Sequence, residues 1–216
     1  MTTDRSGTNV PVDRESLIAE LAGEVKDRRV LDAIAAVPRE LFVPGYRREL
    51  AWENCALPIG EGQTISQPLV VATMCELLSP GPDELVLDVG GGSGYHAAVL
   101  AELAGRVISL ELHEGLAGQA RQSLEMAGVE NVDVIVADGS LGWPQEAPFD
   151  CINVAAAARR QAPARLLEQL GEGGRMVVPV GGRWRQRLEL WRRARGQLSR
   201  ERLVAVNFVP LIEGDA

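Results

Sequence analysis

The segment Leu85–Tyr95, with the sequence L-V-L-D-V-G-G-G-S-G-Y, constrains the fold more than any other part of this chain of 216 residues. Apolar residues lead into an acid, then into a cluster of glycines, and then into a segment with helical character. This pattern predicts a buried parallel strand, a tight turn and the start of a helix. Backbone N–H groups at a helix start are unpaired, and glycines leave room for a ligand to approach them. We therefore expect a nucleotide-like ligand at the end of the first strand of an α/β sheet.

The glycine spacing narrows the class of ligand. Glycines stand at Gly90, Gly92 and Gly94, whereas the dinucleotide fingerprint needs its third glycine one position later, where this chain has Tyr95. The G-x-G-x-G pattern resembles the first motif of S-adenosylmethionine-dependent methyltransferases. Two alternatives stay open at this point: a nicotinamide-dependent oxidoreductase, which would need the shifted glycine, and a strand–helix turn that binds no ligand.

Acidic residues follow the next two predicted strands as well. Glu111 ends the strand expected at 106–111 and lies 21 positions after Gly90, close to the spacing of about 20 expected for an acid that binds ribose hydroxyls. The strand expected at 132–137 runs into Asp138 and Gly139, where an acid could accept a hydrogen bond from an adenine amino group. Asp-Gly is also an ordinary turn sequence, so this pair alone does not decide between the two roles. The three strand ends together predict one ligand-binding rim.

Alternation of strands and helices predicts the fold class. We expect an α/β fold, with a doubly wound, mostly parallel sheet of the Rossmann-like methyltransferase type, a C-terminal antiparallel hairpin and N-terminal helices. Residues 38–67 are rich in proline and glycine with little regular pattern, which is typical of a binding loop. The expected strands are 85–89, 106–111, 132–137, 149–154, 174–180 and the hairpin 185–193 and 201–209, turning at Gly196; the expected helices are two within 16–37, then 68–79, 95–103, 114–127 and 163–170.

Length and composition bound the organisation of the chain. We expect a single methyltransferase domain over 1–216, with a frayed terminus at 1–13, helices and a substrate loop at 14–80, and the cofactor-binding sheet and terminal hairpin at 81–216. A net charge of −8 argues against broad nucleic-acid binding. Eight arginines between 183 and 202 are a local exception, which we interpret as a solvated strand face.

The cysteines, the N-terminal residues and the apolar runs argue against a metal site, a secreted protein and a membrane span. Cys55, Cys75 and Cys151 show no metal-ligand spacing with the two histidines and no disulfide framework, so we expect no metal site. The N-terminus does not resemble a signal peptide, and no run approaches the roughly 18 apolar residues of a membrane span. We expect a cytoplasmic monomer without nucleic-acid or membrane partners.

The segment at 60–68, G-E-G-Q-T-I-S-Q-P, is more specific than the glycine motif. It closely resembles a segment of the protein-L-isoaspartate O-methyltransferase family. The resemblance implies methyl transfer from S-adenosylmethionine to the α-carboxylate of L-isoaspartyl residues in damaged proteins or peptides, with S-adenosylhomocysteine as the product. Further matching pieces extend from about Val30 to Leu211 and include 37–44, 56–60, 138–144, 147–150, 173–181 and 208–211.

The implied reaction does not require a general base. A carboxyl group with an ordinary pKa near 4 is already ionised at neutral pH. The reaction is an in-line displacement at the methyl group of a sulfonium, in which opposite charges cancel. Exclusion of water and a fixed line of attack should therefore supply most of the acceleration.

The resemblance also implies roles for individual residues. Ser66 would hydrogen-bond the reacting carboxylate, with Thr64 and Gln63 shaping the same loop; the alternative role of Ser66 is to cap the helix that follows. On the cofactor side, the methionine end would be held by Asp88, Gly90, Gly92, Ser93 and Gly94, the ribose by Glu111, and the adenine by Asp138 and Gly139.

Four positions depart from the usual family pattern. Gly91 stands where Thr is usual, His96 where Gln is usual, Leu69 where Tyr is usual, and Ala155 in place of a polar residue. Leu69 and Ala155 bear on the substrate rim and leave the acceptor open. One alternative is a tailoring O-methyltransferase that acts on an Asp side chain of a dedicated peptide. Another is a binding module that keeps the cofactor without turnover.

Overall fold

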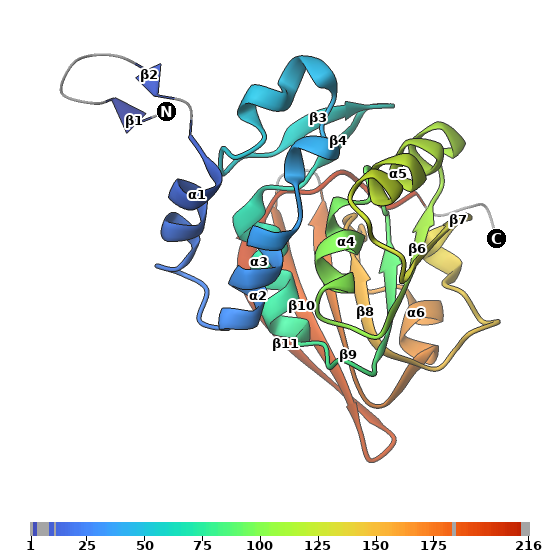
Figure 1. The fold of residues 1–216 in the computed structure, drawn as a ribbon. Coiled ribbons are helices and arrows are strands. Elements are labelled where there is room, and N and C mark those ends of the chain that lie inside the picture. Colours follow the sequence, from blue (N-terminus) through green and yellow to red (C-terminus); the bar gives the residue numbers. More distant parts are fainter. Residues whose placement is uncertain (1, 4–8, 11, 183–184, 213–216) are drawn as a thin grey trace.

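A computed structural model describes residues 2–3, 9–10, 12–182 and 185–212 of the chain. Within these residues the centre of the molecule is a seven-stranded sheet with the order β11-β10-β9-β8-β5-β6-β7 (Figure 1). Strands β10 and β11 form an antiparallel hairpin at one edge of the sheet, and the strands from β5 to β9 run parallel to one another. The expected α/β fold with a C-terminal hairpin is therefore confirmed. The strands are β5 Leu85–Val89, β6 Arg106–Glu111, β7 Val132–Val136, β8 Phe149–Val154, β9 Leu170–Gly182, β10 Arg185–Ala194 and β11 Gln197–Val206.

The strand order reverses beside β5. The chain passes outward from β5 to β6 and β7 and then returns to β8, which pairs with the opposite side of β5. The chain therefore leaves the two sides of β5 in opposite directions, which opens a crevice at the carboxyl ends of the strands. Open α/β sheets bind their ligands in this crevice.

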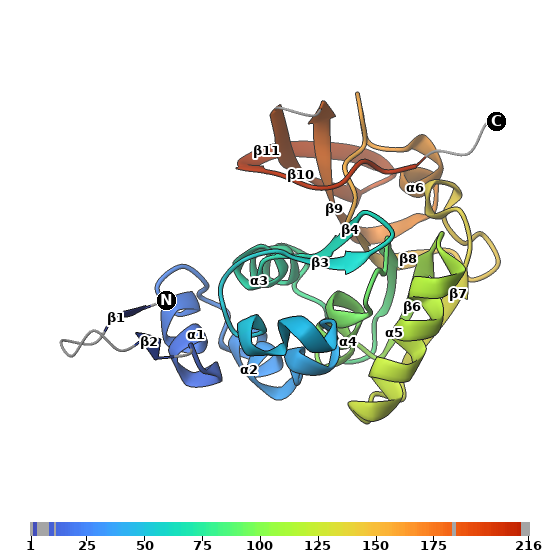
Figure 2. The ribbon, with the colours of Figure 1, turned by 90° about the horizontal axis from the view of Figure 1, so that it is seen from above.

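Helices cover both faces of the sheet (Figure 2). Alternate residues of one strand enter different cores: Val86 packs toward α3, α4 and α5, whereas Leu87 and Val89 pack toward α6. This two-sided burial explains the continuous apolar sequence of β5. The helices are α1 Arg14–Leu21, α2 Arg28–Ala36, α3 Pro68–Leu78, α4 Tyr95–Ala101, α5 Glu114–Met126 and α6 Ala164–Glu168.

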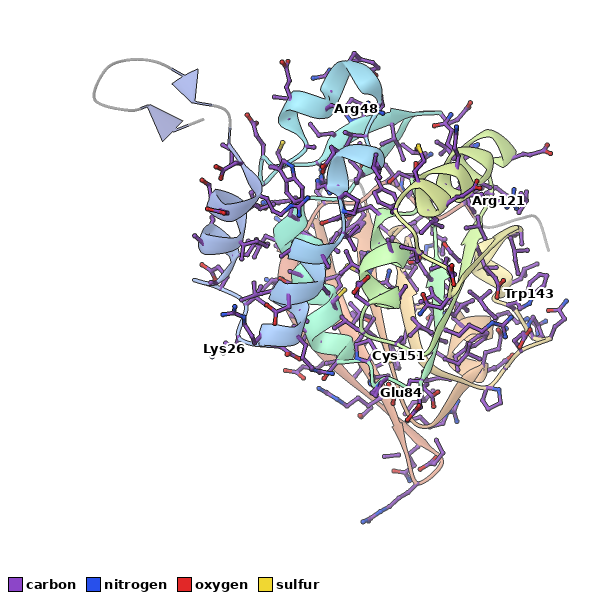
Figure 3. All side chains as sticks on the ribbon, viewed as in Figure 1. Lys26, Arg48, Glu84, Arg121, Trp143 and Cys151 are labelled. Atoms are coloured by element: carbon purple, nitrogen blue, oxygen red, sulfur yellow. The ribbon has the colours of Figure 1, made fainter. Side chains whose placement is uncertain are left out.

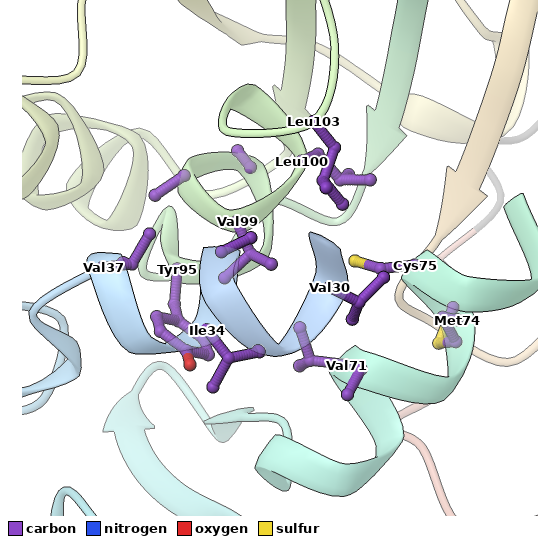
Figure 4. Packing of buried hydrophobic residues seen from close by; sticks show 14 of the residues in the cluster. Val30, Ile34, Val37, Val71, Met74, Cys75, Tyr95, Val99, Leu100 and Leu103 are labelled. Atoms are coloured by element: carbon purple, nitrogen blue, oxygen red, sulfur yellow. The ribbon is translucent and has the colours of Figure 1, made fainter. Parts of the chain in front are cut away.

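The larger core joins α2, α3 and α4. Ile34 of α2, Val71 of α3 and Val99 of α4 are fully buried and meet in one layer with Tyr95 (Figure 4). Burying an aliphatic side chain of this size contributes about 1.5–3 kcal/mol. Because α3 follows the segment 60–67 and α4 follows the glycine turn, this layer fixes the two predicted site segments relative to each other.

The segment 38–67 is more ordered than its sequence suggests. It contains the 3₁₀ turns η1 Arg39–Leu41 and η2 Gly45–Leu50, and an antiparallel hairpin of β3 Leu57–Gly60 with β4 Gln63–Ile65. Strands this short, one of them containing a proline, give no readable period in the sequence, and so the expectation of an irregular loop was wrong here.

A buried arginine ties this segment to α4. Arg39 is fully buried; its Nε donates to the Ala51 carbonyl at 2.8 Å and its Nη2 to the Cys55 carbonyl at 3.2 Å. Its guanidinium lies 4.7 Å from the centre of the Tyr95 ring. Burial lowers the pKa of Arg39. Carbonyl oxygens and an aromatic face surround this cation, which ties the segment before β3 to α4.

The opposite end of the sheet is held by a separate ion pair. Arg175 Nη2 lies 2.6 Å from Glu84 Oε2, and the Cys151 thiol donates toward the same carboxylate at 3.7 Å. Figure 3 places Glu84 and Cys151 close together, away from the β3–β4 hairpin. Among the described residues, no group of three His, Cys, Asp or Glu side chains is placed to hold a metal ion. The described helices include none long and apolar enough to cross a membrane.

Several boundaries differ from expectation. α6 is shorter than the expected 163–170, and β9 starts at Leu170 rather than at 174, because a register shift lets the glycine-rich segment pair with β8. β11 ends at Val206 rather than at 209. The expectation of a frayed terminus falls partly on residues 1, 4–8 and 11, outside the described residues; Thr2–Thr3 and Asn9–Val10 pair as short antiparallel strands.

The described arginines of the hairpin have exposed side chains, as expected, except Arg193, which is half-buried and donates to the Leu167 carbonyl at 2.6 Å. Arg200 and Arg202 both approach the buried carboxylate of Glu189, with N–O distances of 3.5 and 3.1 Å. Arg192 pairs with Glu201 across the two strands at 3.4 Å. Arg183 lies outside the described residues.

Candidate active site

A cavity lies at the carboxyl ends of four strands, which we call the strand-end cavity. Its floor comes from the ends of β5, β6 and β8 and from the turn after β7, and the β3–β4 hairpin and the C-terminal segment form its sides. The lining residues are Gln63, Thr64, Val89, Gly90, Gly92, Leu110–His113, Gly139, Ala155, Ala156 and 209–212.

A second cavity, the hairpin cavity, adjoins the first. Thr64, Ala155 and Val209 line both, so the two spaces share a wall. Ser66 and Gln67 line the hairpin cavity but not the strand-end cavity. A smaller recess joins Ser66 to Ser93. The predicted residues of the donor side and of the acceptor side therefore meet around Thr64.

The glycine turn is braced by the protein itself. The N–H groups of Gly90 and Gly91 both donate to the Leu110 carbonyl, at 2.9 and 3.0 Å, and the N–H of Gly94 donates to the Gly91 carbonyl at 2.8 Å. The expectation of free N–H groups at the turn therefore does not hold for Gly90, Gly91 and Gly94, because β6 and the turn satisfy them. The helix that follows, α4, has only seven residues. What the turn offers is a surface without side chains, with Gly90 and Gly92 at φ of +84° and +54°.

Glu111 connects the turn to the second strand. The residue is 5% exposed, and its carboxylate oxygens accept from the Gly92 N–H and from the His113 N–H, both at 2.8 Å. A carboxylate can accept about four hydrogen bonds, so these two leave capacity on the side that lines the strand-end cavity.

Asp88 lies beneath the turn rather than on a cavity wall. It is fully buried; its carboxylate oxygens accept from Ser109 Oγ at 2.9 Å and from Asn153 Nδ2 at 2.7 Å. Burial raises the pKa of Asp88 to about 6, while the bonds from Asn153 and Ser109 oppose that shift. We predicted that Asp88 contacts the ligand directly. The structure instead places Asp88 behind the glycines, where it supports the turn.

The polar network behind the turn continues to a histidine. His96 Nδ1 lies 3.2 Å from Asn153 Nδ2, and His96 Nε2 lies 3.6 Å from Cys75 Sγ. Burial lowers the pKa of His96 to about 3, so the ring is neutral at physiological pH. The neutral His96 ring can accept one N–H of the Asn153 amide at Nδ1. The other N–H of the same amide then donates to Asp88.

The other predicted residues fall into two groups. Gly139 lines the strand-end cavity, and a Cβ there would meet Val89 Cγ1 at 2.6 Å, so a larger residue would have to displace the Val89 side chain. Asp138 is not on the wall of either cavity; it caps η3 (Gly139–Leu141) by accepting from the Ser140 N–H at 2.9 Å. Gly94 also lies off both walls, at the start of α4 with φ +86°.

Ser66 does not cap α3. The N-cap residue is Gln67, without a side-chain bond, and the free N–H of Leu69 is satisfied by Asn54 Oδ1 at 3.0 Å. The Ser66 hydroxyl has no partner among the described residues and faces the hairpin cavity. The capping alternative was therefore wrong. Gln63 reaches the strand-end cavity, with its Nε2 donating to the Glu61 carbonyl at 3.3 Å.

Sequence reasoning missed two parts of the site. Residues 207–209 line the hairpin cavity and residues 209–212 line the strand-end cavity, although the piece 208–211 was recognised as similar to the family without a role. Asn153, Ser109 and His96 form the network behind the turn, and the sequence singled out only His96, as a departure from the family pattern.

Comparison with known proteins identifies the family. A family model described as protein-L-isoaspartate(D-aspartate) O-methyltransferase matches residues 13–216. The chain belongs to this family. The protein-L-isoaspartate O-methyltransferase of Roseiflexus castenholzii is 51% identical over 192 residues, covering 89% of this chain and 88% of that protein. That of Methanoregula boonei is 48% identical over 200 residues, covering 92% of each.

Solved structures agree with this family membership. A protein-L-isoaspartate O-methyltransferase superposes with a TM-score of 0.83 at 29% identity; the match covers 92% of this chain and 65% of that longer chain. A Plasmodium falciparum protein named as a member of the same family superposes with a TM-score of 0.81 at 25% identity, covering 93% and 98%. The latter was solved in complex with S-adenosyl-L-homocysteine. The resemblance inferred from the sequence motifs is confirmed.

Proposed function

We propose that this chain transfers a methyl group from S-adenosylmethionine to the α-carboxylate of L-isoaspartyl residues in damaged proteins and peptides. The strand-end cavity takes the donor and the hairpin cavity takes the acceptor. The observation that carries this assignment is the shared wall at Thr64, Ala155 and Val209, which brings the two cavities together beside Ser66.

The residues of the strand-end cavity fit an S-adenosyl group. Gly90, Gly92 and Gly139 leave the floor free of side chains, and the unused acceptor capacity of Glu111 suits ribose hydroxyls. Leu112 and Ile212 supply apolar surface at the mouth, suited to an adenine ring. When bound, this group supplies a methyl made electrophilic by a sulfonium charge.

The hairpin cavity fits an anionic nucleophile that must keep its charge. Every residue of its described lining is uncharged, and the hydroxyls of Ser66 and Thr64 are free to donate. An α-carboxylate is already ionised near neutral pH, so it needs orientation and shelter from water rather than a base. Neutral donors orient the carboxylate without pairing it to a cation that would reduce its nucleophilicity.

The same proposal extends to the setting of the enzyme. Isoaspartyl proteins are its partners, and we place it as a monomer in a reducing cytoplasm. The three cysteines support the reducing location, because all of them are free thiols in the structure.

A paired-peptide assay tests the proposed activity. The protein is incubated with methyl-labelled S-adenosylmethionine and two peptides that differ only in an isoaspartyl or an aspartyl linkage at one position. We expect label in the isoaspartyl peptide alone, and loss of that label in Ser66→Ala. Label only in the aspartyl peptide would favour the tailoring alternative, and absence of label from both peptides would contradict the proposal.

A further inference from the structure

The chain beyond β11 forms a wall common to both cavities. We call residues 207–212 the terminal strap. Asn207, Phe208 and Val209 line the hairpin cavity, and 209–212 line the strand-end cavity. Since the strap lies outside the sheet, the position of this wall depends on the few hydrogen bonds that hold its backbone.

One side of the strap is bonded to the segment after β8. The Ala157 N–H donates to the Val209 carbonyl at 2.8 Å, and the Leu211 N–H donates to the Ala157 carbonyl at 2.9 Å. Ala158 in turn pairs with the end of β9, donating to the Pro179 carbonyl at 2.9 Å. These bonds fix the half of the strap that faces the strand-end cavity.

The other half is held by one side chain. Gln186 Oε1 accepts from the Phe208 N–H at 2.6 Å, and Gln186 Nε2 donates to the Phe208 carbonyl at 3.0 Å. Gln186 belongs to β10, where its backbone faces Gly181 of β9 and Val206 of β11, and it is 6% exposed. Its primary amide presents a donor and an acceptor together, as a peptide group does, and so continues strand pairing past Val206, where β11 ends.

We propose that Gln186 is a positioning residue for methyl transfer. It touches neither cavity, but it sets the place of Phe208 and thereby the shape of the acceptor side of the site. The inference rests on the proposed function. The buried amide of Gln186 continues the wall that Ala205 and Val206 of β11 begin, so acceptor binding depends on this amide as well as on the sheet.

The chain supplies a matched control for this inference. Gln169 is also buried, at 8% exposed, and it also grips backbone at both ends of its amide: Oε1 accepts from the Trp143 N–H at 2.7 Å and Nε2 donates to the Leu141 carbonyl at 2.8 Å. The turn it holds, η3, contributes Gly139 to the strand-end cavity and contributes nothing to the described lining of the hairpin cavity.

The test compares Gln186→Met with Gln169→Met, two variants that remove the same kind of clamp. Steady-state kinetics with an isoaspartyl peptide gives KM and kcat, and thermal unfolding reports the general loss of stability. We expect the peptide KM of Gln186→Met to rise roughly tenfold, as for a free-energy loss of about 1.4 kcal/mol. We expect Gln169→Met to keep the wild-type peptide KM. An equal change of KM in both variants, or none in Gln186→Met, overturns the inference.

Two further measurements keep the test decisive. Gln186→Glu retains only acceptors, so its carboxylate faces the Phe208 carbonyl, and we expect a KM at least as high as that of Gln186→Met. Hydrogen exchange on the wild-type protein should show the Phe208 amide protected relative to the exposed Asn207 amide, and equal exchange would overturn the clamp even if the variants fail to fold. Wild-type protein that does not label the isoaspartyl peptide refutes the proposed function instead.

Discussion

The departure from the family pattern at Gly91 has a structural explanation in the space around its Cα. Gly91 does not share the positive φ of Gly90, Gly92 and Gly94, so its backbone accepts other residues. The obstacle is space, since a Cβ at this position would lie 2.3 Å from Ser109 Oγ. Ser109 uses that oxygen to bond Asp88 at 2.9 Å. A side chain at 91 and a hydroxyl at 109 therefore exclude each other.

The magnitudes follow from these contacts. Gly91→Ala must displace the Ser109 hydroxyl, and we expect a loss of about 1–3 kcal/mol in the free energy of unfolding from overpacking. Ser109→Ala removes a hydrogen bond to a buried carboxylate, with an expected loss of about 1.5–3 kcal/mol. In the double variant the new Cβ would lie 3.6 Å from the Cβ at 109, an ordinary contact. The double variant should therefore be about as stable as Ser109→Ala alone.

Urea unfolding of the four proteins measures this cycle. We expect the two single losses to be non-additive by about 1–3 kcal/mol, in favour of the double variant. Gly91→Thr combined with Ser109→Ala should recover more, because a Cβ at 91 lies 3.8 Å from Asp88 Oδ2 and a hydroxyl on it can replace the lost bond. Additive losses in the cycle would show that a side chain at 91 and the Ser109 hydroxyl do not compete for the same space.

Three other predictions concern single side chains. Ser66→Ala should lower kcat while the free energy of unfolding changes by less than about 0.5 kcal/mol; an unchanged kcat would remove Ser66 from the acceptor side of the reaction. Glu111→Ala should weaken S-adenosylhomocysteine binding roughly 10–100-fold in calorimetry, because charged hydrogen bonds contribute about 1.5–3 kcal/mol each, and an unchanged Kd would remove Glu111 from the donor site. Burial raises the pKa of Asp88 from 3.8 to about 6, so between these values the native state holds a proton that the unfolded state has lost. The wild type should therefore lose stability relative to Asp88→Asn as pH rises through this window, by roughly 3 kcal/mol at about 1.4 kcal/mol per pKa unit; a constant difference in urea unfolding would contradict the shift.

The sequence predicted those parts of the fold that local patterns encode. The apolar run of β5, its glycine turn and the strand–helix alternation follow from periodicity and turn chemistry, and they led to the correct sheet. The β3–β4 hairpin was missed because its strands are too short for any period to show. The boundaries of β9 and β11 depend on register with neighbouring strands, which no local pattern carries.

The site was predictable to the extent that its residues lie in motifs. Gly90, Gly92, Glu111 and Gly139 do line one cavity, and Thr64 joins them. The position of Asp88 could not be read from its place at a strand end, because burial depends on Ser109 and Asn153 arriving from other strands. The terminal strap reaches the site only through tertiary pairing with Ala157 and Gln186, far away in the sequence.

A crystal structure of the protein with S-adenosylhomocysteine would locate the donor directly. We expect the ligand in the strand-end cavity, with its ribose at Glu111, its adenine between Gly139 and the terminal strap, and its sulfur on the side of the shared wall nearest Ser66. A ligand bound elsewhere, or a cavity closed by the protein's own side chains, would contradict it.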